Sequence, residues 1–236
     1  MTGLTREQTL VEMGLGPLWK LRHLHREPAA AKRSEPEPQI TVPPASTDEW
    51  TRLREDVANC RQCGLCEQRK QAVLGVGDIN ADWLIVGEGP GADEDELGEP
   101  FVGVAGKLLD NMLAAIQLKR GEGVYIANAV KCRPPGNRTP SDDELAACRS
   151  FLVKQIELTQ PRLIVALGSS AAKTLLRKTE VKVGALRGQL LSAEGIPLII
   201  TYHPSYLLRS PMEKAKAWED LCFMRRTMQT LQETVA

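Results

Sequence analysis

The sequence predicts an α/β fold built on a mainly parallel sheet of four strands. Four short apolar runs rich in β-branched residues lie between residues 83 and 202, and each gap between successive runs contains a stretch with helical periodicity. Continuous apolar runs are typical of strands that helices cover on both faces. With 236 residues, the chain is long enough for one such domain and some extension, and a second full domain is not expected.

The N-terminal part of the chain is expected to lie outside this domain. Residues 1–25 are predicted to contain an amphipathic helix, which begins at the Thr-x-x-Gln capping box of Thr5. Residues 26–47 are predicted to be a flexible linker rich in Pro, Ala and charged residues, because this composition cannot bury enough apolar surface to fold.

The folded domain is expected to span residues 48–236. Asp48 is a candidate helix N-cap, and Trp50, Leu53 and Val57 fall on one face of the helix that follows. The expected strands are WLIVG (83–87), VYIANAV (124–130), RLIVALG (162–168) and PLIITY (197–202). The helices expected between them cover residues 104–118, 142–158, which opens with a capping box from Ser141 to Glu144, and about 169–178.

The charges of the chain balance, but they are segregated along it. Thirty basic and thirty acidic residues give a formal net charge of zero, so composition does not indicate a polyanionic partner. Residues 88–99 nevertheless carry six carboxylates and no basic residue, whereas residues 162–209 carry seven Lys or Arg against two Glu. Lys131, Arg133 and Arg138 add a further basic cluster. Two interpretations remain open: a basic stripe that contacts a phosphate backbone, or ordinary solvated surface charge.

The N-terminus lacks the apolar core and cleavage site of a signal peptide, and no apolar run is long enough to cross a bilayer. We therefore expect a cytoplasmic protein without a membrane contact. In that compartment the six cysteines are expected to be metal ligands, catalytic groups or buried small residues rather than disulfides.

Polar or glycine-rich clusters follow every expected strand. They are GEGPG (87–91), Asn128 with KCRPPGNR (131–138), GSSAA (168–172) and HPSYLLR (203–209). Because parallel strands end at the same edge of a sheet, these clusters are predicted to converge on one site there, although Gly, Pro and Asn are also common turn residues.

His203 is the only histidine of the expected domain. Without a nucleophile in a recognisable elbow, a hydrolase triad is not supported, so we expect His203 to donate a hydrogen bond to developing negative charge, with a structural turn as the alternative. GEGPGA also satisfies a loose dinucleotide fingerprint. Pro90 and the carboxylates of residues 93–96 argue against that interpretation, because a pyrophosphate would dock where those carboxylates lie.

Three cysteines stand at intervals of three residues in CRQCGLC, at Cys60, Cys63 and Cys66. Cys132 and Cys148 follow much later, so five thiols are available for the four positions that a metal or iron–sulfur centre takes. Cys222 is interpreted as a buried residue of the last helix.

An ordered set of motifs covers the chain from about Cys60 to Arg209: CxxC, GEGPGxxED, GEPFVGxAGxLL, NAVKCRPPxNRxP, LGxxA and HPSYLLR. In this set the chain resembles the family 4 uracil-DNA glycosylases, the iron–sulfur members of the uracil glycosylase superfamily. The resemblance implies a three-layer α/β/α sandwich, a structural four-iron, four-sulfur cluster, and excision of uracil from DNA to leave an abasic site in base excision repair. No lysine is placed to form a Schiff base, so the enzyme is expected to be monofunctional.

The resemblance places the cluster ligands on Cys60, Cys63, Cys132 and Cys148, with the register set by CGLCEQR from Cys63 onward. Cys66 then has no ligand position, and its replacement of Cys60 after a local shift stays open.

The resemblance also implies how the base is held. Phe101 stacks on the extruded uracil, the Asn128 amide pairs with the edge of uracil, which differs from that of cytosine, and His203 donates a hydrogen bond to uracil O2 as negative charge builds there.

Around the sugar, the resemblance assigns Glu88 to positioning of water or to stabilisation of oxocarbenium character. Glu94 is expected to help exclude the methyl group of thymine. Gly89 stands where other branches of the superfamily carry Asp or Asn, so no strong side-chain base is expected at that position.

Contacts with DNA are expected from HPSYLLR, in which Ser205, Tyr206, Leu207, Leu208 and Arg209 resemble a loop that enters the minor groove. Burial of the two leucines under the last helix is the alternative. Phosphate and backbone contacts are expected from Asn137, Arg138, Arg187 and Arg209.

The expected partner is uracil-containing DNA, single- or double-stranded, bound by a monomer. Residues 1–46 are a candidate docking segment for a protein partner. Two alternative functions remain open: a non-catalytic iron–sulfur protein that binds nucleic acid, and a nucleotide-dependent oxidoreductase.

Overall fold

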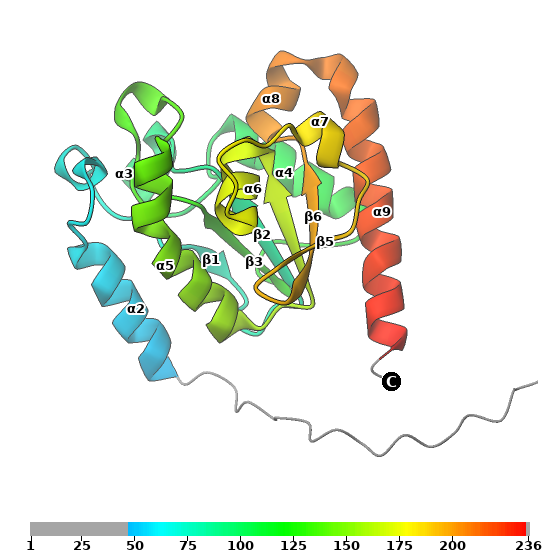
Figure 1. The fold of residues 1–236 in the computed structure, drawn as a ribbon, viewed down its shortest axis with the longest axis horizontal. Helices are drawn as coiled ribbons and strands as arrows, with labels where there is room; N and C mark the ends of the chain where they lie inside the picture. Colours follow the sequence, from blue (N-terminus) through cyan, green and yellow to red (C-terminus); the bar gives the residue numbers. More distant parts are fainter. Residues whose placement is uncertain (1–46, 235–236) are drawn as a thin grey trace, which may run out of the picture. The chain divides into compact units, whose positions relative to one another are not determined.

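A computed structural model describes residues 47–234 of the chain (Figure 1). The helix expected within residues 1–25 and nearly all of the expected linker lie outside these residues. In the described part, none of the helices has both the length and the apolar character needed to cross a membrane.

The described residues fold around one six-stranded sheet with the strand order β1-β3-β2-β4-β6-β5. The strands are β1 (Val76–Gly77), β2 (Trp83–Gly87), β3 (Val124–Asn128), β4 (Leu163–Leu167), β5 (Leu191–Ala193) and β6 (Ile196–Thr201). The four central strands pair in parallel and coincide with the four predicted apolar runs. The expected number of four strands is wrong, because short antiparallel strands of two and three residues extend both edges and are too brief to give an apolar pattern.

Helices precede, connect and follow the strands. They are α2 (Thr47–Asn59), α3 (Ala92–Leu97), α4 (Val104–Ala115), α5 (Asp142–Thr159), α6 (Gly168–Leu176), α7 (Val183–Leu186), α8 (Pro204–Arg209) and α9 (Lys214–Glu233), with 3₁₀ turns at Gly64–Glu67, Pro135–Asn137 and Pro211–Glu213. The predicted capping box opens α5, since the Glu144 backbone N–H donates to Ser141 Oγ at 3.2 Å and the Ser141 N–H donates to the Glu144 carboxylate at 2.8 Å.

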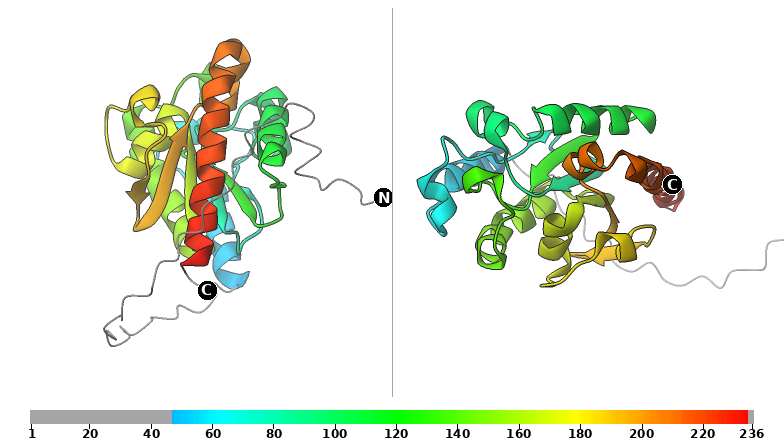
Figure 2. Two further views of the ribbon diagram at one scale, coloured as in Figure 1. Left: turned by 90° about the vertical axis from the view of Figure 1, so that its right-hand side faces the viewer. Right: turned by 90° about the horizontal axis from the view of Figure 1, so that it is seen from above.

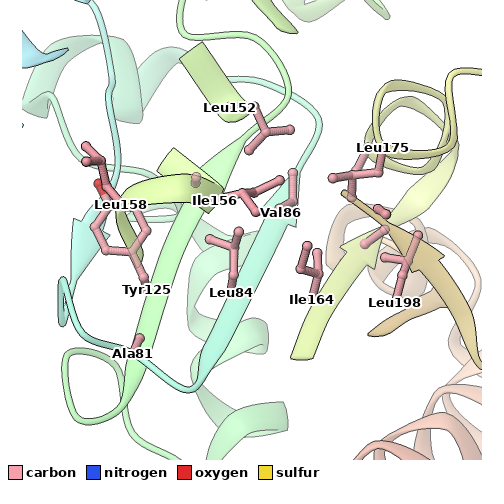
Figure 3. Close-up of a cluster of buried hydrophobic side chains, with 14 of the residues drawn as sticks. Ala81, Leu84, Val86, Tyr125, Leu152, Ile156, Leu158, Ile164, Leu175 and Leu198 are labelled. Carbon is pink, nitrogen blue, oxygen red and sulfur yellow. The ribbon is translucent and has the colours of Figure 1, made fainter. Parts of the chain in front are cut away.

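Helices cover both faces of the sheet, so the predicted three layers are confirmed. Alternate residues of β2 face opposite ways: Trp83 and Ile85 pack with α4 and α9, whereas Leu84 and Val86 pack with α2, α5 and α6. Figure 2 shows α4 on one side of the sheet and α5 and α6 on the other. In the core between the sheet and helices α2, α5 and α6, Ile156 of α5 lies beside Val86 (Figure 3).

Helix α2 docks as its apolar spacing predicts. Trp50, Leu53 and Val57 are buried, and the Trp50 ring lies 5.1 Å from that of Tyr125 in β3, measured between ring centroids. This helix delivers the chain to the cysteine-rich turn of residues 60–69, which therefore begins from a fixed point on the domain.

Candidate functional site

The segments that follow β2, β3 and β6 meet at one edge of the sheet, where they enclose a cavity of about 400 Å³. The fourth segment, after β4, reaches this edge through Ser170, which contacts the cavity residue Glu88. The convergence expected from parallel strand ends is therefore present. The predicted site residues that line the cavity are Glu88, Gly89, Glu94, Phe101, Asn128, Asn137, Arg138, His203, Ser205 and Arg209.

Asn128 ends β3 with its side chain in the cavity wall. The residue is 2% exposed, and its Oδ1 is buried without a hydrogen-bond partner among the described residues. A buried acceptor without a donor costs about 1–3 kcal/mol, so such an atom points to a ligand that supplies the donor. Gly87 makes room for this amide, because a Cβ there would meet Asn128 Oδ1 and the Phe101 ring, each at 2.4 Å.

Phe101 presents its ring to the same cavity from a left-handed backbone conformation, with φ of 57°. Its ring centroid lies 5.5 Å from that of His203, with the two planes inclined by 30°. A non-glycine residue in this conformation costs about 1–3 kcal/mol and persists only when its surroundings hold it.

Two side chains hold the backbone around Phe101 from opposite sides. The Glu94 carboxylate accepts hydrogen bonds from the N–H groups of Val102 and Gly103, at 3.0 and 3.1 Å. The Arg120 guanidinium donates to the carbonyls of Pro100 and Phe101, at 2.8 and 2.9 Å. Both oxygens of Glu94 are occupied, because the second accepts from the Gly91 N–H at 3.0 Å, so this carboxylate fixes the cavity wall.

His203 has a defined tautomer. Its Nδ1 accepts from the Ser205 backbone N–H at 3.1 Å and lies 2.8 Å from Ser205 Oγ, which leaves the ring proton on Nε2. The pKa of His203 is lowered to about 4, mainly by burial and also by the positive charge of Arg209, while the Glu94 carboxylate opposes the shift. The imidazole is therefore neutral at pH 7 and keeps one N–H donor for a ligand.

Glu88 follows β2 and is oriented by a residue that motif analysis did not single out. Ser170, buried at the start of α6, donates from Oγ to Glu88 Oε2 at 2.6 Å. The GSSAA cluster at the end of β4 was the sequence signal for this contact. Beside Glu88, a Cβ on Gly89 would lie 2.7 Å from a methyl group of Val130, so a larger residue does not fit without movement.

A second cavity is lined by all five candidate thiols and by residues that follow β3. Cys60, Cys63 and Cys66 come from the turn after α2, Cys132 follows β3, and Cys148 lies in α5. Arg69 fastens the turn to the domain, because its guanidinium donates to Cys132 Sγ at 2.8 Å and to the Cys60 carbonyl at 3.2 Å.

The donor set of this thiol pocket fits an iron–sulfur cluster. Within residues 47–234 no group of three His, Cys, Asp or Glu side chains converges on a point for a single ion. In a four-iron cluster each cysteine binds a different iron, so the four sulfurs surround a volume instead of a point. Burial raises the pKa of the Cys132 thiol, Arg69 opposes this, and neighbouring Cys63 and Cys60 raise it further. Cys60 and Cys66 both line the pocket, so the choice between them as the fourth ligand stays open.

Helix α8 separates the two leucines of HPSYLLR. Leu207 is 1% exposed and packs in the core with α4 and α9, so its expected role in the minor groove is wrong for this conformation, and the alternative of burial holds for it. Leu208 and Tyr206 are 39% and 37% exposed. Met212, which the sequence analysis missed, follows them at 88% exposure.

Two basic residues also differ from expectation. Arg187 donates from Nε to Asp220 at 3.1 Å and from a terminal nitrogen to Glu219 at 3.0 Å, so its charge is engaged within the protein rather than offered to a phosphate. Lys131 is 1% exposed and cannot belong to a basic surface stripe. Arg138 is exposed and lines the cavity, but it also forms a two-pronged ion pair with Glu144.

The sequence was also compared with known protein families and with curated proteins. The sequence matches the uracil DNA glycosylase superfamily over residues 74–222. It is 44% identical over 178 residues to the type-4 uracil-DNA glycosylase of Pyrobaculum aerophilum, covering 72% of this chain and 90% of that relative. The corresponding protein of Thermotoga maritima is 46% identical over 159 residues, with 67% and 82% coverage. That of Archaeoglobus fulgidus is 42% identical over 163 residues, with 66% and 81% coverage.

Proposed function

Because the chain belongs to the uracil DNA glycosylase superfamily, alongside its type-4 members, we propose that it hydrolyses the N-glycosidic bond of deoxyuridine in DNA. The products are free uracil and an abasic site, and the process served is base excision repair. The observation that carries this proposal is the buried Asn128 Oδ1, which has no hydrogen-bond partner among the described residues and lies in a cavity that Phe101 and the neutral His203 also line. The base must leave the stack to reach such a cavity.

Uracil is recognised by its edge. Uracil presents an N3–H donor beside the O4 acceptor, and the Asn128 carboxamide offers an acceptor and a donor in the matching order. Cytosine presents an acceptor at N3 and a donor at N4, so it leaves the buried Oδ1 unsatisfied. Phe101 covers the face of the base, and its strained backbone, held by Glu94 and Arg120, keeps the ring in place before the base arrives.

The leaving uracil is stabilised by His203. As the glycosidic bond breaks, negative charge develops on the base, and the Nε2–H of a neutral imidazole donates to it at O2. A donor that is already oriented does not have to reorganise during the reaction. The hydrogen bonds from Ser205 to Nδ1 supply that orientation.

Glu88 acts on the sugar side of the bond. Its carboxylate, held by Ser170, stabilises positive charge on the sugar and positions the attacking water. Gly89 contributes only main chain, so leaving-group stabilisation carries more of the rate. Among the described residues, no lysine lines the cavity, in keeping with a monofunctional enzyme that forms no Schiff base.

DNA approaches along the rim of the cavity. Arg209 and Asn137 line this rim, and Ser205, Tyr206 and Leu208 belong to the helix beside it, where an exposed apolar side chain fills the space that the base vacates. Arg138 contacts phosphate after exchanging its ion pair with Glu144, which is exposed to competition from the polyanion.

Cys60, Cys63, Cys132 and Cys148 hold a four-iron, four-sulfur cluster. When bound, the cluster supplies cross-links among the turn of residues 60–69, the end of β3 and α5, and it takes no part in bond cleavage. The thiol pocket and the cavity that would hold the reacting bond share no lining residue.

The test is a labelled oligonucleotide with a single uracil, single-stranded or opposite guanine, incubated with the purified protein beside a thymine control. Alkali then cleaves any abasic site. We expect cleavage of the uracil strands alone, and only after alkali. No cleavage by protein that retains its cluster would favour a non-catalytic iron–sulfur protein that binds DNA.

A further inference from the structure

Lys131 is a fully buried cation without an anionic partner in the described part of the chain. Its ammonium donates to the main-chain carbonyl of Asn128 at 2.7 Å and also binds the side-chain oxygen of Gln155. Both acceptors are neutral. A buried charge normally has a partner of opposite sign, because its removal from water otherwise costs on the order of several kcal/mol.

The thiol pocket adjoins Lys131 and becomes a source of negative charge when its thiols bind iron. Lys131 lines this pocket together with Cys132 and Cys148, and its own backbone N–H donates to Cys148 Sγ at 3.3 Å. Thiols that bind iron do so as thiolates. A cluster held by four of them is anionic, and it would supply the charge that the ammonium lacks.

The same ammonium also contacts Asn128, the residue proposed to recognise uracil. Asn128 ends β3, and Lys131 lies three residues later, so the ammonium closes the turn between them. Gln155 holds the ammonium from α5 and is itself fixed, because its amide donates to the Leu74 carbonyl at 2.9 Å and to the Tyr125 hydroxyl at 3.2 Å.

We propose that Lys131 is a positioning residue that couples the thiol pocket to the recognition of uracil. Its positive charge compensates the negative charge of the cysteine-bound cluster. Its hydrogen bond to the Asn128 carbonyl sets where the Asn128 amide lies in the cavity. This inference rests on the proposed function, which assigns the cluster and the base contact. Through this one side chain, loss of the cluster loosens the uracil site, and loss of the charge loosens the cluster.

Two substitutions separate the two contacts. Lys131→Met keeps the length of the side chain but removes both charge and donor, whereas Lys131→Gln removes the charge and keeps an amide donor toward Asn128. Lys70→Met is the matched control, because Lys70 is exposed, pairs with Glu96 and lies beside the same cysteine turn. Far-UV circular dichroism checks that each variant folds.

Three quantities are measured on the cluster-loaded proteins: the rate of iron loss to a chelator, the midpoint potential of the cluster, and kcat/KM on single-uracil DNA. We expect iron loss to accelerate by about tenfold or more in both Lys131 variants, as for other groups that surround metal ligands. The potential should fall in both, since removal of a nearby cation disfavours the reduced cluster. The value of kcat/KM should fall about tenfold in Lys131→Met and recover partly in Lys131→Gln.

Unchanged iron loss and potential in both variants would overturn the inference, as would wild-type protein that carries no iron. The same holds if neither variant folds while Lys70→Met does, because Lys131 would then be a general core residue. The two cluster measurements require no DNA. If they shift but the wild-type protein excises no uracil, the proposed function fails while the charge role of Lys131 stands.

Discussion

His203 is neutral in the folded protein because burial opposes its charged form, and this has a consequence for stability. Its pKa is lowered to about 4 in the folded state, from about 6.5 in an unfolded chain. Between these values the unfolded chain binds one more proton than the native protein. Stability from this residue is therefore complete above pH 6.5 and is lost as the pH falls toward 4.

We predict that the free energy of unfolding of the wild-type protein decreases by up to about 3 kcal/mol from His203 alone between pH 6.5 and 4. The variant His203→Asn should show a flatter dependence over this range, because it cannot titrate. Urea unfolding at several pH values measures both curves. Parallel curves for the two proteins would show that His203 does not cause the pH dependence of stability.

At pH 7.5, His203→Asn should lose uracil excision by roughly 10²–10³-fold, since it lacks the oriented imidazole donor.

Asn128 is kept for binding at a cost in stability. Its Oδ1 is buried and receives no hydrogen bond from any residue of 47–234, and Gly87 is small enough to let the amide approach. We predict that Asn128→Leu, which has a similar shape and no polar atoms, unfolds at higher urea with a gain of about 1–2 kcal/mol. The same variant should excise no uracil. If Asn128→Leu were less stable than wild type, the unsatisfied acceptor would not be the dominant strain at this position.

At the scale of elements, α8 shows how one short helix divides its side chains between two roles. It follows β6 with Pro204 at its first position and with His203 as its N-cap, whose Nδ1 accepts the Ser205 N–H. The helical repeat then turns Leu207 into the core beneath α4 and α9, while Leu208 faces out beside the cavity residue Arg209.

This division gives a matched pair of substitutions. Leu207→Ala should lower the free energy of unfolding by about 2–4 kcal/mol, because it leaves a void in a close-packed core. Leu208→Ala should change stability by no more than about 0.5 kcal/mol and should instead weaken binding to double-stranded uracil DNA. Chemical denaturation and fluorescence anisotropy separate the two effects. Equal losses of stability in both variants would contradict the orientation of α8.

At the scale of the whole molecule, the cysteine-rich turn connects segments that are far apart in the sequence. Cys60 and Cys63 follow α2, whereas Cys132 follows β3 and Cys148 lies in α5, and the Arg69 guanidinium links Cys132 to the Cys60 carbonyl. A cluster across this pocket closes a long loop, which constrains the unfolded chain more than the native one.

We predict that Cys60→Ala lowers iron content and melting temperature, whereas Cys66→Ala leaves both near the wild-type values. The reason is the register of CGLCEQR, which gives Cys60 and Cys63 ligand positions and Cys66 none. In addition, the Arg69 guanidinium that donates to Cys132 Sγ also holds the Cys60 carbonyl. Iron assay and thermal unfolding by circular dichroism are the measurements. Loss of iron in Cys66→Ala with retention in Cys60→Ala would reverse the assignment.

The sequence by itself determined the α/β class, the four parallel strands, the capping box of α5 and the buried face of α2. These features are local, because apolar period, β-branching and caps act over a few residues. The sequence also placed the polar clusters at one sheet edge, since the carboxyl ends of parallel strands must meet. The short strands β1 and β5 carry no such pattern, and only pairing with β3 and β6 makes them strands.

The tertiary structure alone decided which side chains are exposed for contact with a ligand and which are buried or paired within the protein. Leu207 and Leu208 are neighbours of the same type, and only packing against α4 and α9 separates core from surface. Arg187 and Lys131 look like surface cations in the sequence, but Arg187 pairs with Asp220, and Lys131 is buried with its ammonium on the Asn128 carbonyl. Charge, burial and hydrogen bonding depend on groups distant in the chain, so no local pattern reveals them.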